Sequence, residues 1–121
     1  MLTPPARRRL ETILHPRIRE RWLAQVENWR RSGCALAVVV IPLLFETRAE
    51  SQFDKIICVA CSLKPQRERL AARQWTPEQI EQRIAVQMPI DEKIARSHFV
   101  VWTDGAPELH AQQLERILKI L

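Results

Sequence analysis

Basic side chains that could bind phosphate groups concentrate between Gln66 and Lys93. Gln66, Arg69 and Arg73 are spaced three and four residues apart, so a helix would place them on one face. Arginines on a mobile helical pair can close over a phosphoryl group and neutralise the charge that develops during its transfer. For any one of these residues, Arg83 included, the alternative is a solvated basic face paired with neighbouring glutamates.

A single carboxylate, Glu46, closes the motif Pro-Leu-Leu-Phe-Glu at residues 42–46, directly after an apolar run. If that run is a strand of an open α/β sheet, the motif lies beyond its carboxyl end, where such sheets bind ligands. Glu46 would then be placed for a polar contact with a ligand. The alternative is a solvated glutamate that simply follows the end of a strand.

A basic helical region forms the first quarter of the chain. His15 precedes Pro16 at an expected helix junction, where it either contacts a ligand or caps a helix end. Trp22 and Trp29 fall on the apolar helix face, which favours a place in the core over stacking on bases. Phosphate recognition and nucleic-acid binding would each explain the many arginines. These are Arg7, Arg8, Arg9, Arg17, Arg19, Arg21, Arg30 and Arg31.

The three cysteines do not indicate a metal or redox site. Cys58 and Cys61 are three residues apart, so a strand would point them to opposite faces, and Cys34 is distant in sequence. We therefore assign no metal ligand and expect a reduced, cytoplasmic protein.

The apolar run 35–45 is shorter than the roughly 20 residues that cross a bilayer, and the N-terminus lacks the apolar segment of a signal peptide. These features predict no membrane association.

The composition is that of an ordinary globular domain, with 121 residues, 46% hydrophobic residues, 27% charged residues and a net charge of +5. There are only two glycines, Gly33 and Gly105, and they lie far apart. This spacing excludes a glycine-rich phosphate loop and a dinucleotide-binding turn within the sequence. Any phosphate that these residues bind must be held by side chains or helix ends.

Helices are expected on both sides of the apolar runs. Residues 6–33 should form two helical pieces separated at Pro16, with Gly33 as the C-cap. A further helix should open at Ser62 and run to about Arg73. Its inward residues are expected to be Leu63, Leu70 and Ala71.

A capping box predicts the next helix, because Thr76 can accept from the backbone of Gln79 while the Gln79 side chain reaches back. This helix carries Ile80, Ile84 and Met88 and should end near Pro89, and a last helix should begin near Pro107. Strands are expected at 35–41, 55–61 and 98–102, each apolar at successive positions, as in a strand covered on both faces. Strands that alternate with helices predict one α/β domain, residues 1–121, with a parallel sheet.

Four motifs, in this order and spacing from about Leu10 onward, resemble the dephospho-CoA kinase family. They are Leu14-His15-Pro16-x-Ile18 before a basic helix, Pro42-Leu43-Leu44-Phe45-Glu46, Gln66-x-x-Arg69 with Arg73, and Arg83-Ile84-x-x-Gln87-Met88-Pro89 with Lys93. The resemblance implies a P-loop nucleoside-monophosphate-kinase-like fold, with residues 6–33 in a helical substrate part and 64–96 in a lid-like region. It implies phosphorylation of the ribose 3′-hydroxyl of dephospho-CoA by ATP, with Mg²⁺, in the last step of coenzyme A synthesis.

The resemblance also implies roles for individual residues. Arg73 would be the catalytic lid arginine that faces the phosphates. The remaining residues divide between the two substrates. His15, Pro16, Arg19, Leu43, Leu44 and Glu46 would bind dephospho-CoA, and Arg83, Lys93, Thr103 and Gly105 would join Arg73 in binding ATP.

The sequence departs from the family in several places. The family's first strand, phosphate loop, Mg²⁺ ligand and presumed catalytic Asp have no counterpart, so the fold is expected to be incomplete. Trp102-Thr103 replaces the usual Asp-Asn near the adenine, and Val40, Ala60 and His98 stand where members often carry Asp.

In the family fold, the missing first strand lies between the strands expected at 35–41 and 55–61. Its absence would leave an unpaired edge on each of them. We expect the two strands to collapse together, another chain to supply a strand, or the isolated chain to be marginal and to self-associate. We also expect negligible turnover and no tightly bound cofactor for these 121 residues alone.

One alternative from another class is a non-catalytic binding module that keeps this fold and uses its basic surface. Non-specific nucleic-acid binding would fall steeply with added salt, whereas a substrate pocket would prefer dephospho-CoA at fixed salt. The motifs favour dephospho-CoA and ATP as partners over nucleic acid.

Overall fold

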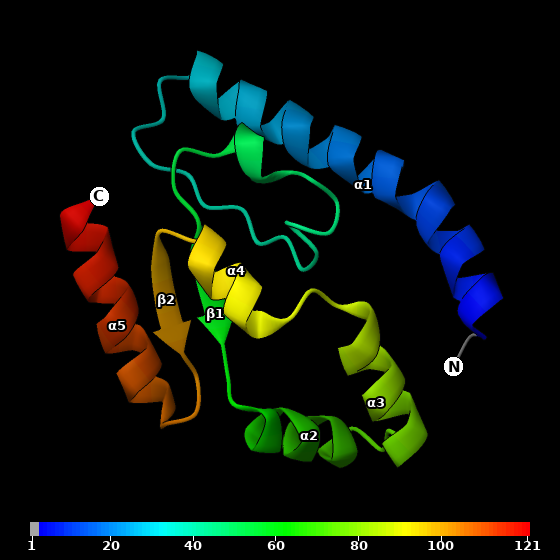
Figure 1. The fold of residues 1–121 in the computed structure, drawn as a ribbon. Coiled ribbons are helices and arrows are strands. Elements are labelled where there is room, and N and C mark those ends of the chain that lie inside the picture. Colours follow the sequence, from blue (N-terminus) through cyan, green and yellow to red (C-terminus); the bar gives the residue numbers. More distant parts are fainter. Residues whose placement is uncertain (1–2) are drawn as a thin grey trace. The chain divides into compact units, whose positions relative to one another are not determined.

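The fold consists of helices and two short parallel strands (Figure 1), and a computed structural model describes residues 3–121. The chain forms two compact units: an N-terminal unit up to Pro42 and a C-terminal unit, Leu43–Leu121. The N-terminal unit contains helix α1, Pro4–Arg31. The C-terminal unit contains η1 (Glu50–Gln52), β1 (Ile57–Ala60), α2 (Leu63–Ala72), α3 (Pro77–Val86), α4 (Ile90–Arg96), β2 (Phe99–Trp102) and α5 (Pro107–Ile120).

The two strands confirm the expected parallel sheet, although each is shorter than the apolar run that predicted it. Ile57 lies opposite Phe99 and Ala60 lies opposite Trp102. At the start of the sheet, the Ile56 amide donates to Nδ1 of His98 at 3.0 Å. An imidazole nitrogen thus accepts a backbone hydrogen bond at the start of the sheet.

The core lies around this sheet, with α5 beside β2 and α4 against β1 (Figure 1). Gln113 of α5 satisfies the outer edge of β2: its Oε1 accepts from the Trp102 amide at 2.8 Å and its Nε2 donates to the Trp102 carbonyl at 2.9 Å. This side-chain amide replaces a neighbouring strand at that point. The buried apolar residues are Phe45, Ala49, Ile56, Cys58, Ala60, Ile80, Val101 and Ile117.

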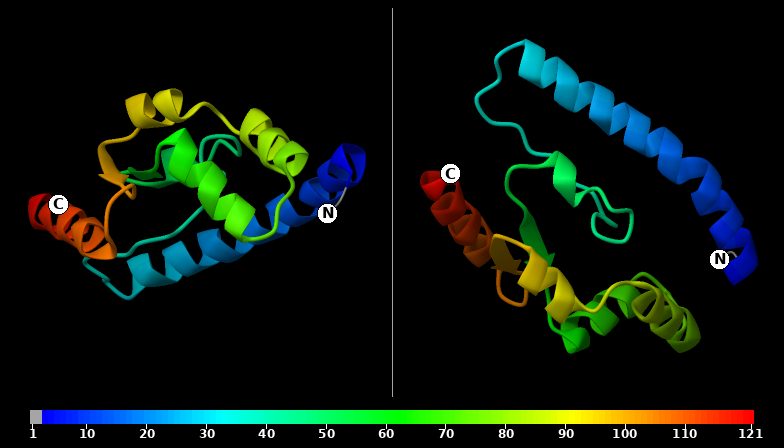
Figure 2. Two further views of the ribbon diagram at one scale, coloured as in Figure 1. Left: turned by 90° about the horizontal axis from the view of Figure 1, so that it is seen from below. Right: turned by 45° about the horizontal axis from the view of Figure 1, so that its top comes forward.

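Helix α1 is continuous, and the expected break at Pro16 was wrong. Both views in Figure 2 show one unbroken helix, with Pro16 inside it. A proline removes a single backbone donor, and the turns on both sides keep their own hydrogen bonds. His15 therefore lies within a helix and not at a junction. Trp22 and Trp29 are half-buried, and no residue of α1 is buried, so these tryptophans do not form a core.

The expected strand at 35–41 is not formed. The segment is extended, and Leu36, Val38 and Val40 are 55%, 63% and 88% exposed. A strand needs a partner for its backbone groups, and within the N-terminal unit the described elements offer only a helix. Gly33, in contrast, ends α1 as expected: its φ is 72°, and the Cys34 amide donates to the Trp29 carbonyl in a Schellman motif.

The helices of the lid-like region follow the expected signals in part. The capping box between Thr76 and Gln79 is present at the start of α3. Leu63 and Ala71 were expected to point inward but are exposed, because α2 packs against α3 on one side only. Helix α4 is separate from α3 and was not expected, although acidic residues in its first turn are a helix signal.

Candidate functional site

A one-turn loop at residues 43–48 carries Glu46 and is built as a helix end. The Ala49 amide donates to the Leu44 carbonyl and the Arg48 amide donates to the Phe45 carbonyl, with Arg48 at a φ of 55°. This is the Schellman pattern. Phe45 and Ala49 are 7% and 1% exposed, so they anchor the loop in the core.

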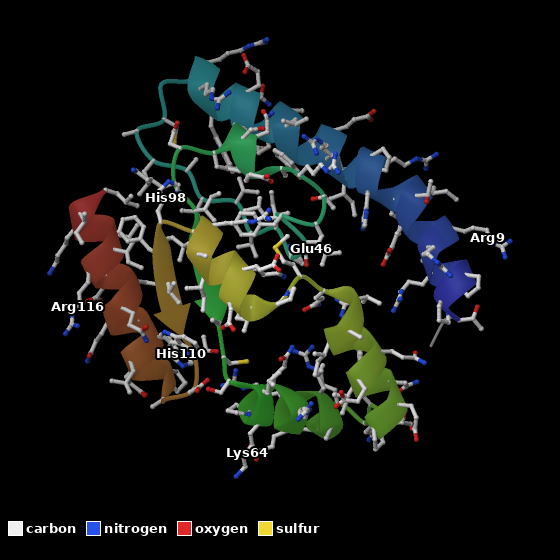
Figure 3. The ribbon with its side chains drawn as sticks, in the orientation of Figure 1. Arg9, Glu46, Lys64, His98, His110 and Arg116 are labelled. Atoms are coloured by element: carbon white, nitrogen blue, oxygen red, sulfur yellow. The ribbon has the colours of Figure 1, made fainter. Side chains whose placement is uncertain are left out.

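Glu46 binds to two groups from the α3–α4 region (Figure 3). Its Oε2 lies 2.9 Å from Nζ of Lys93 and accepts from the Met88 amide at 3.3 Å. The side chain of Lys93 is 19% exposed and that of Glu46 is 18% exposed. We call Glu46, Met88 and Lys93 the Glu46 cluster. The structure therefore brings together two predicted site residues, Glu46 and Lys93, that were assigned to different substrates.

The charge of Lys93 sets the electrostatics of this cluster. Burial raises the pKa of Glu46, but the hydrogen bond and charge of Lys93 and the backbone hydrogen bonds outweigh it, so this pKa lies below its ordinary value. Oε1 of Glu46 is buried and has no hydrogen-bond partner. Nearby, burial raises the pKa of the Cys58 thiol, while Lys93 and Ser97 act to lower it. Cys58 is thus held as a neutral thiol in the core.

A second cluster closes the carboxyl ends of β1 and β2. Asp104 accepts from the Ser62 amide at 2.8 Å and from the Ser62 hydroxyl. Arg69 donates to the Thr103 hydroxyl at 3.1 Å and to the Thr103 carbonyl. We call Ser62, Arg69, Thr103 and Asp104 the Asp104 cluster. It ties the turn after β2 to the start of α2, at the edge of the sheet where open α/β folds bind ligands.

The Asp104 carboxylate is ionised more readily than usual. Its hydrogen bonds from Ser62 lower its pKa, with a further contribution from the charge of Arg69. Next to it, a Cβ on Gly105 would lie 2.8 Å from Cδ1 of Leu109, so glycine allows the turn to pass close to α5. The ring of His110 hydrogen-bonds to the Gly105 carbonyl at 2.9 Å.

The two arginines predicted to lie in a lid, Arg73 and Arg83, are not held by carboxylates. Arg73 is the exposed C-cap of α2, and Arg83 is half-buried in the last turn of α3. Among residues 3–121 the structure gives neither of them an ion pair, whereas Lys93 is paired with Glu46. The three basic residues expected near ATP therefore divide into two unpaired arginines and one paired lysine.

The other predicted residues for dephospho-CoA lie in the N-terminal unit. His15 and Arg19 are half-buried and one turn apart on α1, and the Arg19 guanidinium lies 5.8 Å from the centre of the Trp22 ring. Pro16 lies between them and is exposed.

Sequence reasoning missed the residues that hold these sites in shape. Ser62 was predicted only to start a helix, and no role was predicted for Asp104 or Gln113. A local role for Ser62 and Asp104 could have been predicted, because serine before a helix and aspartate in a turn both bind backbone amides. Their contact with each other could not have been predicted, because they are 42 residues apart.

Within the described part of the chain, no group of three potential metal-ligating side chains lies close enough to hold a metal ion. The helices among these residues also include none that is long and apolar enough to span a membrane.

Comparisons with known proteins give the family. The family model for dephospho-CoA kinase matches residues 2–108. Curated proteins named dephospho-CoA kinase are similar over most of the chain. The one from Bdellovibrio bacteriovorus is 41% identical over 118 residues, which is 98% of this chain and 59% of that protein. The one from Rhodopseudomonas palustris is 40% identical over 117 residues, and the one from Agrobacterium fabrum is 42% identical over 114 residues.

These matches cover 96% and 93% of this chain, respectively, and 59% of each of those two relatives. The chain thus spans about three-fifths of the length of the relatives it matches. Since the family model and the relatives agree over nearly all of the 121 residues, the chain belongs to the dephospho-CoA kinase family.

Proposed function

We propose that this chain supplies the acceptor-binding and lid regions for the phosphorylation of the ribose 3′-hydroxyl of dephospho-CoA by ATP, the last step of coenzyme A synthesis. Family membership over nearly the whole chain supports this reaction. The observation that carries the proposal is the Glu46 cluster, in which the loop with Leu43 and Leu44 is tied to the α3–α4 region. A kinase needs its acceptor site and its lid to be placed together before phosphoryl transfer.

The roles in this proposal follow the chemistry of the groups. Arg73 is the catalytic lid arginine that faces the transferring phosphoryl group, and Arg83 assists it. Their unpaired guanidinium groups are the ones that can neutralise developing charge. Thr103 and Gly105 belong to the turn that lies by the adenine of ATP. The acceptor dephospho-CoA contacts His15, Pro16, Arg19, Leu43, Leu44 and Glu46.

The proposed reaction uses ATP with Mg²⁺ in the complete protein, in which residues 6–33 form part of the substrate domain and 64–96 form the lid. The described residues do not fit a metal site of their own. We therefore assign no residue here to Mg²⁺. We place the reaction in the cytoplasm, because its substrates are soluble metabolites.

The sheet supports the proposal that a further strand with a phosphate loop completes the fold. The Ile56 and Ala60 carbonyls accept hydrogen bonds from β2 and the Thr103 amide that follows it. Since alternate peptide groups of a strand face opposite sides, those of Ile57 and Val59 face away from β2. The described residues place no strand on this edge of β1, and the extended segment 35–41 also has no strand partner among them. We propose that the free edge of β1 takes an additional strand or pairs between copies of the chain.

The test is release of ADP from a mixture of ATP and dephospho-CoA, measured with a coupled enzyme. The 121-residue chain alone should show no turnover above a protein-free blank. Addition of the N-terminal segment of a relative, which carries the phosphate loop, should restore ADP release that depends on dephospho-CoA. Arg73→Ala should abolish it and the exposed Lys64→Met should not. Full activity of the chain alone, or restored activity without Arg73, would contradict the proposal.

A second candidate, a basic interaction module, is favoured by one observation. Residues 1–42 contain eight arginines and three glutamates, whereas residues 43–121 contain eleven basic and eleven acidic residues. The whole net charge of +5 therefore lies in the N-terminal unit. Binding of an unrelated polyanion with a steep salt dependence, together with no preference for dephospho-CoA, would favour this module.

A further inference from the structure

We propose that Lys93 is not a phosphate ligand but a positioning residue, which holds Glu46 so that the 43–48 loop presents Leu43 and Leu44 to the acceptor substrate. The inference rests on the proposed function for the identity of that substrate. It changes the role that the family resemblance implies for Lys93. It also divides the basic residues of the lid-like region into two functional classes.

The geometry of the Glu46 cluster is that of a fixed contact between elements distant in sequence. One carboxylate oxygen, Oε2, receives both Nζ of Lys93 at 2.9 Å and the Met88 amide at 3.3 Å. Met88 lies in the connection between α3 and α4, and Lys93 lies on α4. A single carboxylate thus joins the loop to both parts of the lid-like region. Phe45 and Ala49 anchor the loop in the core, and the two contacts at Oε2 add a polar connection from Glu46 to the α3–α4 region.

The buried Glu46 carboxylate needs the positive charge of Lys93 beside it. The Glu46 and Lys93 side chains are four-fifths buried, and Oε1 of Glu46 is buried without a partner. A largely buried carboxylate with one unpaired oxygen depends on a neighbouring cation, because removal of one member of such a pair leaves an uncompensated charge. A phosphate that captured Lys93 would have to break this pair. Lys93 is therefore a poor candidate for ATP binding.

Arg73 and Arg83 provide the contrast. Neither has an ion pair among the described residues, and Arg73 is exposed. An anion can therefore bind to these two arginines without breaking an ion pair to a carboxylate. Guanidinium groups also match phosphate oxygens in a bidentate manner, which an ammonium group does not. We therefore assign the binding of phosphates to the two arginines. Lys93 instead positions the 43–48 loop.

A double-mutant cycle distinguishes the two roles of Lys93. Glu46→Gln, Lys93→Met and the double variant are titrated separately with dephospho-CoA and with ATP, by isothermal calorimetry on the 121-residue chain. If Lys93 positions Glu46, each single variant and the double variant should lose a similar affinity for dephospho-CoA, about tenfold, because the pair acts as one unit. ATP affinity should change by less than about twofold, and Lys93→Arg should restore part of the loss. Lys64→Met and Glu108→Gln are the matched controls on exposed positions.

Two results of this double-mutant cycle would contradict a positioning role for Lys93. A loss of ATP affinity with Lys93→Met that Glu46→Gln does not share would make Lys93 a phosphate ligand and overturn the proposal. Additive losses for dephospho-CoA would do the same.

A second measurement keeps the inference testable if the wild-type chain binds neither ligand, an outcome that would count against the proposed function instead. Hydrogen exchange of the Met88 amide should accelerate to a similar extent in Glu46→Gln, Lys93→Met and the double variant, and should stay unchanged in the two controls. Unchanged protection of Met88 in Lys93→Met would show that Lys93 does not position Glu46.

Discussion

The two units of this chain have a similar share of apolar residues but differ in what those residues do. Among residues 3–121, all eight buried apolar residues lie in the C-terminal unit, which carries no net charge. The N-terminal unit has a comparable supply of Leu, Ile, Val and Trp, yet none of its described residues is buried. Apolar residues form a core only when another element faces them. The comparison shows that hydrophobic pattern and hydrophobic burial are separate properties.

Hydrogen bonds follow the same division. In α1, side-chain hydrogen bonds such as Thr12 to the Arg8 carbonyl and Arg31 to Glu27 join residues one turn apart. In the C-terminal unit, Ser62 to Asp104 and Met88 to Glu46 each join residues 42 positions apart. The C-terminal unit is therefore held by tertiary polar contacts, and α1 is held mainly by its own backbone.

The largest expected effect tests the core of the C-terminal unit. Ile117→Ala removes a side chain that is 6% exposed, and should lower the free energy of unfolding by about 2–5 kcal/mol. On the same helix, Ile120 is 72% exposed, and Ile120→Ala should change it by less than about 0.5 kcal/mol. Urea titration followed by circular dichroism measures both. Equal costs for the two variants would show that α5 does not pack as described.

A change in α1 should act in the opposite direction. Pro16→Ala restores a backbone donor inside the helix and should stabilise α1 by about 1–3 kcal/mol, because no tertiary contact compensates for the proline there. Thermal melting of the helical circular dichroism signal provides the measurement, with Pro107→Ala at the first position of α5 as a control of small effect. If Pro16→Ala melted at a lower temperature, Pro16 would have a packing role that the structure does not show.

The edge of the sheet gives an intermediate effect. Gln113→Leu removes both hydrogen bonds to the backbone of Trp102 and should cost about 1–2 kcal/mol, whereas the exposed neighbour Gln112→Leu should be nearly neutral. The same variant should raise the tendency to self-associate, because an edge strand with free backbone groups pairs with other strands. Analytical ultracentrifugation of both variants checks this. A monomeric, fully stable Gln113→Leu protein would show that this contact is dispensable.

The smallest expected effect is a dependence on pH. The pKa of Glu46 is lower in the folded chain than in the unfolded chain, so the unfolded state takes up its proton first as the pH falls. The stabilisation is thus complete above the ordinary glutamate pKa of about 4.3 and is lost as the pH falls through the folded value. We expect wild type to lose more stability than Glu46→Gln between pH 6 and pH 3, which urea titration at each pH measures. Asp104 adds a loss of the same sign in both proteins, so it cancels in the difference. Parallel pH profiles would contradict the role of Glu46.

Local interactions were readable from the amino-acid sequence alone. The capping box of Thr76 and Gln79 and the end of α1 at Gly33 depend on residues close to one another in the chain. The strands within 55–61 and 98–102 were predicted from their local apolar composition, although they pair across 42 positions. The family motifs were readable for a different reason, since they require only residue types in a given order. The predicted site residues from His15 to Gly105 were named on this basis, and their roles stay predictions.

Only the tertiary structure decided which groups meet. The apolar run 35–41 has the composition of a buried strand, but it has no partner strand among the described residues and remains extended and exposed. The pairing of Glu46 with Lys93 and of Asp104 with Ser62 has no signature in either local segment. Strand pairing and ion pairing both need a second group that the fold must bring within about 3 Å. A residue's type states what it can bind, and the fold determines what it does bind.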